Sequence, residues 1–558
     1  MRNLTRTVAM GLALAALGLA GTASAATQAE LMKLHRGGTL ELISSSSEGT
    51  IDPQVNYTAE YWQLYQGVYD GLVTFAKGEG ADGNKIVPDL ATEIPAAEDG
   101  GKTYVFHLRK GIKFSNGQEV TVNDVYASFV RIFKVKGPTA GTFYNGIVGA
   151  DACLQNPDTC SLKDGIVVDP KADTVTFHLT APDPEFFDKL AVPHASILPA
   201  DSPMTDVGTK PLPGTGPYMF KSYAPNQELI MVRNPNFKQW SEAAQPDGFP
   251  DEIDYKFGLT TDASVTAVEN GQADWMFDSP PTDRLSEIGT KYASQVHVSP
   301  LTAFYYLAMN VNLAPFDNQK VRQAVNYAID RNALVNLFGG KVLAQPACTI
   351  LPPGFPGYEA HCDYTKDPGT KWTAPDLAKA KELVKESGTA GQKVTVIVED
   401  KAVDRNIGTY VQSVLNEIGY DASVKAISAN IQFTYIQNTN NKVQISLSDW
   451  YQDYPAASDF LNVLLSCASF HPGSDSSINI SGFCDKKVDA DMAQAMSTAI
   501  TDPAAANKEW AKIDQEVMVA APMAPLFNPK RVDFVSKRLG NFVFSNQNQF
   551  IPELAWVK

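Results

Sequence analysis

The fold is decided by the stretch "KVTVIVEDKAVDRNIGTYVQSVLNEIGYDASVKAIS", Lys393 to Ser428. Its first eight residues form a short β-branched run, which predicts a strand. A helix is expected next, because apolar residues recur at helical spacing before a glycine: Ile407, Val411, Val414, Leu415, Ile418 and Gly419. Further strands are expected over 421–428 and 442–448. This strand–helix–strand order predicts an α/β fold with a mostly parallel sheet and covering helices.

An acidic and aromatic segment, "QISLSDWYQDYPAASDFL" (444–461), begins inside the last of these strands. Its carboxylates and aromatic rings alternate closely: Asp449, Trp450, Tyr451, Asp453 and Tyr454. In open α/β sheets ligands bind at the carboxyl ends of the strands. The segment therefore predicts one wall of a site that accepts a cation, while the alternative for Asp453 is that it caps the turn before Pro455.

Aromatic residues also gather in "NYTAEYWQLYQGVYDGL", residues 56–72. Tyr61, Tyr65 and Tyr69 recur every four residues, which favours a packing stripe on a helix. Tyr57 precedes this regular part and is therefore free to line a cleft.

The N-terminus has the pattern of a secretory signal peptide over residues 1–25. Arg2 and Arg6 precede a short apolar run that ends in Ala23-Ser24-Ala25, so we expect cleavage after Ala25. A membrane anchor is the alternative, but it needs about 20 apolar residues without such an end. No Cys follows the apolar run to accept a lipid. An exported, soluble protein is predicted.

Six cysteines follow the predicted cleavage site, an even number that indicates disulfides in an exported chain. Pairing between sequence neighbours closes the shortest loops: Cys153–Cys160, Cys348–Cys362 and Cys467–Cys484. Other connectivities stay open. A zinc site is disfavoured, because the sequence has no C-x-x-C and no clustered His.

Composition and missing motifs favour a binding protein over an enzyme. The chain has 558 residues, which predicts two or three domains, and its net charge of −16 argues against nucleic acid as a partner. Motifs for hydrolases, zinc proteases, P-loops and dinucleotide binding are absent from the sequence. A glycosidase pair among the many carboxylates stays open. No cofactor and no metal are predicted.

The sequence resembles a known family in several blocks that follow the family's order. The most specific is "PDLATEIPAAEDGGKTYVFHLRKGIKFSNGQEVTVNDVYASF" (88–129); others are "IDPQ" (51–54), "LPGTGPYMF" (212–220), "AVENGQADW" (267–275) and "YLAMNVNLAPFDNQKVRQAVNYAIDR" (306–331). They resemble the extracellular solute-binding proteins of peptide/nickel ABC importers, the group of oligopeptide- and dipeptide-binding proteins. The resemblance covers nearly the whole chain after the signal peptide.

This resemblance implies a two-lobed periplasmic-binding-protein fold of type II, in the large cluster with an extra subdomain, and a hinged cleft. The first lobe would comprise residues 26–300 and 528–558, with the subdomain at about 74–212, and the second lobe 301–527. The implied function is a monomeric periplasmic receptor that captures di- or oligopeptides and delivers them to a membrane permease. A receptor for a glycoside, a nickel chelate or another non-peptide solute is the first alternative, and a secreted hydrolase the second.

The resemblance also implies roles for single residues. Peptide-binding members place the Asp of a W-x-x-D strand end against the peptide α-ammonium, and Trp450 and Asp453 match this pattern, followed by Tyr454. The chain departs from many relatives after Tyr454, so the motif identifies the pocket wall better than the ligand. Arg405 is the candidate for a peptide carboxylate, with an exposed surface position as its alternative.

Overall fold

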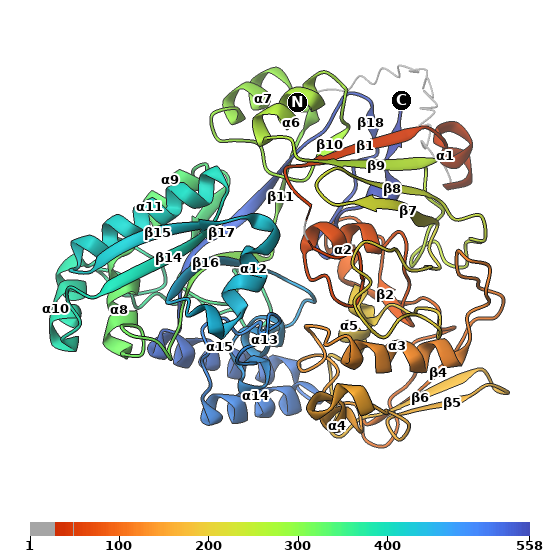
Figure 1. The fold of residues 1–558 in the computed structure, drawn as a ribbon, viewed down its shortest axis with the longest axis horizontal. Helices are drawn as coiled ribbons and strands as arrows, with labels where there is room; N and C mark the ends of the chain where they lie inside the picture. The colour runs from red at the N-terminus through yellow and green to blue at the C-terminus, as the bar shows by residue number, and fades with distance from the viewer. Residues whose placement is uncertain (1–27, 48) are drawn as a thin grey trace, which may run out of the picture.

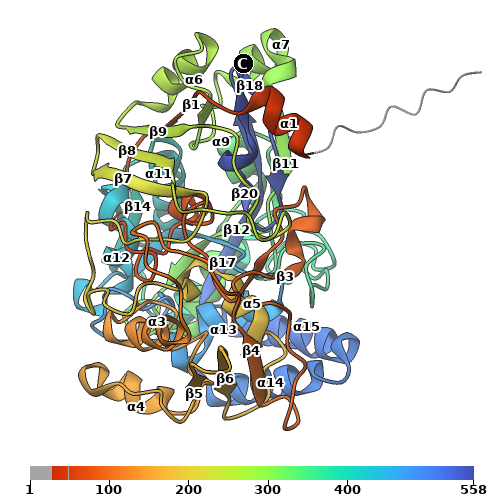
Figure 2. The ribbon, with the colours of Figure 1, turned by 90° about the vertical axis from the view of Figure 1, so that its right-hand side faces the viewer.

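The computed structural model describes residues 28–47 and 49–558 and consists of two lobes with a different sheet in each (Figure 1). The predicted signal peptide, residues 1–25, lies outside the described residues. Within the described residues, no helix combines the length and hydropathy needed to cross a membrane. Figure 2 shows the same molecule from the side, with the C-terminus and the first described helix, Gln28–His35, at the end that carries the first lobe's sheet.

The first lobe is built on a five-stranded sheet. Its strands, in spatial order, are β10 (Trp275–Met276), β1 (Thr39–Ser44), β9 (Glu252–Phe257), β8 (Glu228–Arg233) and β7 (Tyr218–Ala224). β1 pairs in parallel with β10 and β9, whereas β8 pairs antiparallel with β9 and β7. The associated helices are α1 (Gln28–His35), α2 (Ala59–Tyr65), α6 (Thr261–Glu269) and α7 (Leu285–Lys291). Tyr61 and Tyr65 of α2 are buried in this lobe's core, which confirms their packing role. Tyr69 is buried in the same core but lies beyond the end of α2, so the helical stripe does not extend to it.

A subdomain extends the first lobe, with its own three-stranded sheet. Its elements are β2 (Val73–Phe75), β3 (Ile86–Pro88), β4 (Thr103–His107), α3 (Val122–Lys134), α4 (Ala150–Gln155), β5 (Ile166–Asp169), β6 (Thr174–His178) and α5 (Phe186–Ala191). Helix α3 begins at a capping box in which the Asp124 carboxylate accepts from the Thr121 backbone N–H at 2.7 Å. Its apolar face, including Val125 and Phe129, is buried in the subdomain core.

The second lobe contains a seven-stranded mixed sheet. Its strands are β11 (Val296–Pro300), β17 (Met523–Phe534), β12 (Ala303–Met309), β16 (Ile445–Tyr451), β14 (Lys393–Glu399) and β15 (Asp421–Ile427), with β13 (Ala344–Pro346) beside β17. β14 pairs in parallel with β15 and β16, as the strand–helix–strand pattern predicts. The prediction of a mostly parallel sheet is wrong, because β11, β12 and β13 all pair antiparallel to β17.

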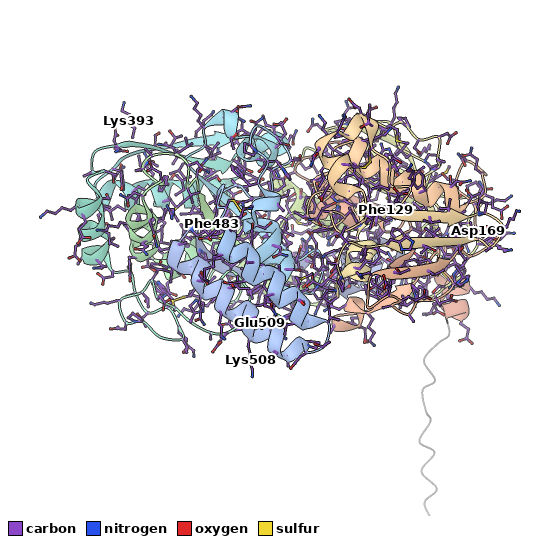
Figure 3. All side chains as sticks on the ribbon, turned by 90° about the horizontal axis from the view of Figure 1, so that it is seen from below. Phe129, Asp169, Lys393, Phe483, Lys508 and Glu509 are labelled. Atoms are coloured by element: carbon purple, nitrogen blue, oxygen red, sulfur yellow. A yellow bond between two sulfur atoms is a disulfide. The ribbon has the colours of Figure 1, made fainter. Side chains whose placement is uncertain are left out.

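Helices cover this sheet and extend from it toward the first lobe (Figure 1). They are α8 (Gln319–Ala328), α9 (Arg331–Phe338), α10 (Leu377–Ser387), α11 (Ala402–Glu417), α12 (Ala429–Gln437), α13 (Ala457–Leu465), α14 (Lys486–Ala499) and α15 (Pro503–Ala520). α14 and α15 lie side by side below the lobe junction (Figure 3). Buried residues of α13 and α15 belong to the same apolar cluster as the subdomain core, so this cluster crosses from one lobe to the other.

Two stretches of chain connect the lobes. β17 pairs with β12 through residues 523–527 and with β11 through residues 530–534, and its neighbour Val535 bridges to Trp275 in the first lobe's sheet. After β17, the chain stays on the first lobe in short strands: β18 (Leu539–Gly540), β19 (Phe544–Ser545), β20 (Gln549–Phe550) and β21 (Trp556–Val557). The loop between β19 and β20 reaches the second lobe, because Gln547 contacts Gln452 there.

The six cysteines form three disulfides, Cys153–Cys160, Cys348–Cys362 and Cys467–Cys484, which is the neighbour pairing that the sequence predicts. The first lies in the subdomain, and the other two lie in the second lobe. The third closes the loop that carries Asp475 to the space between the lobes.

Candidate ligand-binding site

A cavity of about 1530 Å³ lies between the two lobes. Its lining includes Tyr57 and Trp62 from the first lobe, and Trp450 and Asp453 from the second. The carboxyl ends of the parallel strands β14 and β16 open into it, the place where ligands bind in open α/β sheets. The volume exceeds the roughly 300–1,000 Å³ typical of small-molecule sites, which leaves room for a ligand of several residues.

The carboxyl group of Asp453 lies just beyond β16 and is covered by the first lobe. The Tyr57 hydroxyl donates a hydrogen bond to Asp453 Oδ2, and Gln547 Nε2 donates to the Asp453 backbone carbonyl. Asp453 is 7% exposed. Burial raises the pKa of this carboxyl to about 7, against the lowering effect of the bonds from Tyr57 and Asp459. A ligand cation placed here would favour the ionised form.

A second carboxyl lies beside Asp453. It belongs to Asp459 in α13 and contacts the backbone of the turn at Asp453. Asp459 Oδ2 accepts the backbone N–H of Asp453 at 2.8 Å, and the two side chains also share a hydrogen bond. Burial and the neighbouring Asp453 raise the pKa of Asp459 well above its usual range, so the pair retains a proton. The turn is therefore fixed by Asp459, and the Asp453 carboxyl is directed to Tyr57 and the cavity.

Aromatic rings surround the Asp453 carboxyl. Tyr57 contacts Trp450 edge-on with ring centroids 5.7 Å apart, and Trp62 lies 5.2 Å from Tyr57. The Trp450 indole N–H has no hydrogen-bond partner within the described part of the chain. Tyr57, Trp450 and Asp453, three of the residues singled out from the sequence, thus meet in one wall of the cavity.

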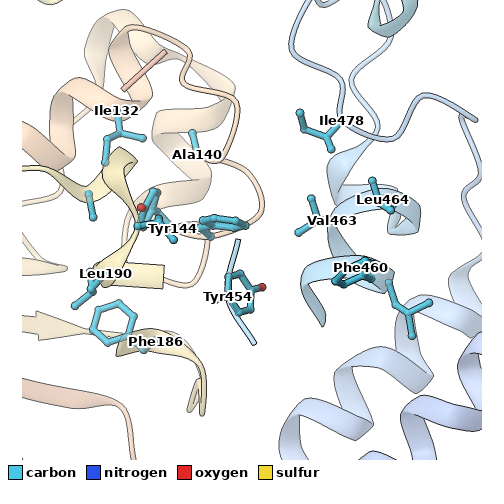
Figure 4. Close-up of a cluster of buried hydrophobic side chains, with 14 of the residues drawn as sticks. Ile132, Ala140, Tyr144, Phe186, Leu190, Tyr454, Phe460, Val463, Leu464 and Ile478 are labelled. Carbon is cyan, nitrogen blue, oxygen red and sulfur yellow. The ribbon is translucent and has the colours of Figure 1, made fainter. Parts of the chain in front are cut away.

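The structure does not bring Tyr454 or Arg405 to this cavity. Tyr454 is 1% exposed and lies between Phe143, 5.3 Å away, and Ser458, so it packs the lobe junction (Figure 4). Arg405 lies in the first turn of α11 with its side chain 58% exposed, and pairs with Asp400. The apolar face of α11, which includes Ile407, packs on the sheet, and this helix phase turns Arg405 to solvent. Neither position supports the predicted ligand contact.

Sequence reasoning missed the charge balance of the cavity. Ten acidic residues line it: Glu60, Asp206, Asp278, Asp283, Glu399, Asp400, Asp404, Asp449, Asp453 and Asp475. Four basic residues line it: Lys136, Lys401, Lys530 and Arg531. Arg531 is bound to Asp533 at 2.7 Å and Lys401 to Glu399 at 2.8 Å, so the cavity presents an excess of negative charge to a ligand.

The lobes are in contact around the cavity. Ser458 donates to the Glu185 carboxylate of the subdomain, and Asn430 of the second lobe donates to Asn226 of the first at 3.1 Å. Burial raises the pKa of Glu185 to about 7, despite the opposing effect of Lys189. Two carboxyls with raised pKa values, Glu185 and Asp453, therefore lie where the lobes meet.

We expect the ligand-free protein to open as the pH rises. A raised carboxyl pKa favours the protonated form when the lobes are closed, so this stabilisation of the closed form is present at acidic pH and is lost as the pH rises through about 7. For each carboxyl, each pH unit between its ordinary pKa of about 4 and the raised pKa of about 7 removes about 1.4 kcal/mol, and no further loss follows above that interval. Small-angle X-ray scattering should give a larger radius of gyration at pH 8.5 than at pH 5.5.

Asp453→Asn provides the control for this pH effect, because an amide does not titrate. Its radius of gyration should change less between the two pH values than that of the unmodified protein. Equal radii for the unmodified protein at pH 5.5 and pH 8.5 would contradict the expectation.

The protein has two lobes that each carry a sheet and are joined by paired connecting strands. The lobes enclose a polar and aromatic cavity. Together these features define a solute-binding protein. Residues 85–471 match the family model described as "Bacterial extracellular solute-binding proteins, family 5 Middle". The chain belongs to this family. Its members are periplasmic binding proteins rather than enzymes, and the general role of the chain is that of the solute-binding component of an ABC importer.

Known relatives cover nearly the whole chain. The glutathione-binding protein GsiB of Salmonella choleraesuis (strain SC-B67) is 26% identical over 508 residues, which span 88% of this chain and 89% of GsiB. The solved structure of clavulanic acid biosynthesis oligopeptide binding protein 2 has a TM-score of 0.79 and 24% identity, covering 94% of this chain and 96% of that one. The Escherichia coli murein tripeptide binding protein MppA has a TM-score of 0.78 and 23% identity, covering 93% and 98%. The two solved structures confirm the two-lobed fold.

Proposed function

We propose that this protein captures di- or oligopeptides in the interlobe cavity and delivers them to the membrane permease of an ABC importer. The observation that carries the proposal is the Asp453 carboxyl, which is buried in the cavity wall beside Tyr57 and Trp450. A buried carboxylate is stabilised by a cation with good geometry, and the α-ammonium of a peptide is such a cation.

The dimensions and lining of the cavity support a peptide. Its aromatic and apolar wall can cover side chains, and its polar groups can bind a backbone. Water in the remaining space would allow side chains of different sizes. Two of the similar proteins are named as an oligopeptide binding protein and a murein tripeptide binding protein, and these names fit this class of ligand.

The two lobes would close by bending at the two stretches of chain that connect them. We propose hinge positions near Leu301–Asn310 and Pro525–Pro529, lobe boundaries at 26–300 with 528–558 and at 301–527, and a subdomain at about 74–212. Peptide contacts to Tyr57 in one lobe and Asp453 in the other would favour the closed form, which is the form a permease would recognise. We propose that the receptor acts as a periplasmic monomer without enzymatic activity.

A non-peptide solute with a cationic group is the second candidate, because Asp453 and the acidic lining would accept any organic cation. Mass spectrometry of the small molecules released from the purified protein by mild denaturation tests the choice. Peptides of two or more residues are the expected result. Recovery of a sugar, a metal chelate or another non-peptide compound, with no peptide, would contradict the proposal.

A further inference from the structure

Tyr57, whose hydroxyl crosses the lobe junction to Asp453, packs against a buried histidine of the subdomain. This residue, His194, follows α5 in the short turn Pro193–Ala195 and is fully buried. The centroid of its imidazole ring lies 5.0 Å from that of Tyr57 and 5.0 Å from that of Trp62. Because Trp62 also contacts Tyr57, the three rings form one cluster at the cavity wall.

Two ring N–H groups of this cluster converge on the backbone carbonyl of Asn56, the residue before Tyr57. His194 Nε2 donates to this oxygen at 3.0 Å, and Trp62 Nε1 donates to it at 3.1 Å. A backbone carbonyl has two lone pairs, so it can accept both hydrogen bonds. The two bonds fix the main chain at the residue that precedes Tyr57.

The partners of His194 determine its protonation. The Asn56 carbonyl can only accept, so Nε2 carries a proton. Burial lowers the pKa of His194 to about 4, against the raising effect of the bond to Asn56, so the ring is neutral near pH 7. Nδ1 then accepts from the Thr139 hydroxyl, 2.9 Å away. Thr139 thereby favours the tautomer that donates to Asn56.

This restraint matters because Tyr57 lies outside regular structure. It precedes α2 (Ala59–Tyr65), and Thr58 at the start of that helix makes no side-chain capping bond. The Tyr57 hydroxyl is the far end of a long, rigid side chain, so a small rotation of the main chain at Asn56 displaces it by much more. Such a displacement would take the hydroxyl out of hydrogen-bonding range of Asp453.

We infer that His194 is a positioning residue for ligand binding. Through the Asn56 carbonyl, it holds Tyr57 where the hydroxyl meets Asp453 when the lobes close around a ligand. The inference rests on the proposed peptide function. It gives the subdomain, which supplies both His194 and Thr139, a part in recognition that needs no contact between these two residues and the ligand.

Calorimetric titration with trialanine at pH 7.5 tests this role. His194→Leu fills similar space without a donor and should weaken binding about tenfold, whereas His194→Gln keeps a donor and should stay within about threefold of the unmodified protein. In the Tyr57→Phe background, adding His194→Leu should cost less than about threefold, because both changes remove the same cross-lobe hydrogen bond. A purely structural His194 would cost the same in both backgrounds.

His178→Leu is the matched control, because His178 of β6 makes the same kind of contact with a threonine, Thr103, at 3.2 Å. It should bind trialanine as the unmodified protein does. Thr139→Val is a second variant and should weaken binding severalfold, while Thr139→Ser restores it. Unchanged affinity in Thr139→Val and in folded His194→Leu, or an equal loss from His194→Leu in both Tyr57 backgrounds, would overturn the positioning role and leave the peptide function intact.

Small-angle X-ray scattering of the ligand-free protein at pH 5.5 separates this role from the peptide function. The bond between Tyr57 and Asp453 joins the two lobes, so Tyr57→Phe and His194→Leu should raise the radius of gyration by similar amounts. His194→Gln should leave it unchanged. These radii, together with no binding of trialanine by the unmodified protein, would overturn the peptide function and support the positioning of Tyr57 by His194.

Discussion

Replacing Asp453 by Asn is expected to weaken the binding of trialanine by about 3 kcal/mol, or on the order of 100-fold in Kd. The amide keeps the shape of the side chain but leaves the peptide ammonium without a counter-charge in a buried site. Calorimetric titration at pH 7.5 measures the loss. Asp421→Asn, an exposed aspartate at the start of β15, is the control and should bind as the unmodified protein does.

Stability separates loss of function from loss of fold in this variant. The Asp453 carboxyl is buried beside the carboxyl of Asp459, and both have raised pKa values. Removing one acidic group from such a pair removes a desolvation cost and a repulsion. The thermal midpoint of ligand-free Asp453→Asn should therefore equal or exceed that of the unmodified protein. A lower midpoint together with weaker binding would assign Asp453 a structural role instead.

Replacing Arg131 by Met is expected to lower the free energy of unfolding of the first lobe by about 3–5 kcal/mol. Arg131 of α3 is 1% exposed, and its guanidinium binds both oxygens of Asp52, at 2.5 and 3.0 Å. It also binds the Gln54 side chain at 2.9 Å, which explains in physical terms the "IDPQ" block of residues 51–54. Methionine fills similar space but leaves Asp52, which is fully buried, without its counter-charge.

Urea unfolding followed by tryptophan fluorescence measures this loss in the first transition. Arg405→Met is the matched control, since its pair with Asp400 lies at the surface and should contribute no more than about 1 kcal/mol. Adding Asp52→Asn to Arg131→Met should restore part of the stability, because it removes the unpaired buried charge. Equal midpoints for Arg131→Met and Arg405→Met would contradict the assignment.

Local patterns predicted the elements of the fold better than their arrangement. The helix after β14 was predicted from short spacings, and it is present in the structure as α11. Pairing of β12 with β17 joins segments more than 200 residues apart, so no local pattern could indicate that these strands run antiparallel. This long-range pairing is why the predicted mostly parallel sheet is a mixed one.

The same distinction applies to the site. Trp450 and Asp453 could be identified because they lie at a strand end, and that position itself implies a cavity. The prediction for Arg405 depended on the rotational phase of α11, which turns this side chain to solvent. The alternation of side chains along β16 can be followed in the sequence, and it places Asp449 on the same face as Leu447. Because Leu447 is buried in the core, this pattern indicates an acidic residue at the core boundary. Asn548 could not be predicted, because only the folded C-terminal segment brings it to the cavity.

The most direct test of ammonium recognition by Asp453 compares trialanine with N-acetyl-trialanine on the unmodified protein and on Asp453→Asn. Acetylation removes the positive charge and leaves the rest of the peptide in place. The expected result is a loss of about 100-fold on the unmodified protein and less than about threefold on the variant. Equal affinity of the two peptides for the unmodified protein would contradict the account.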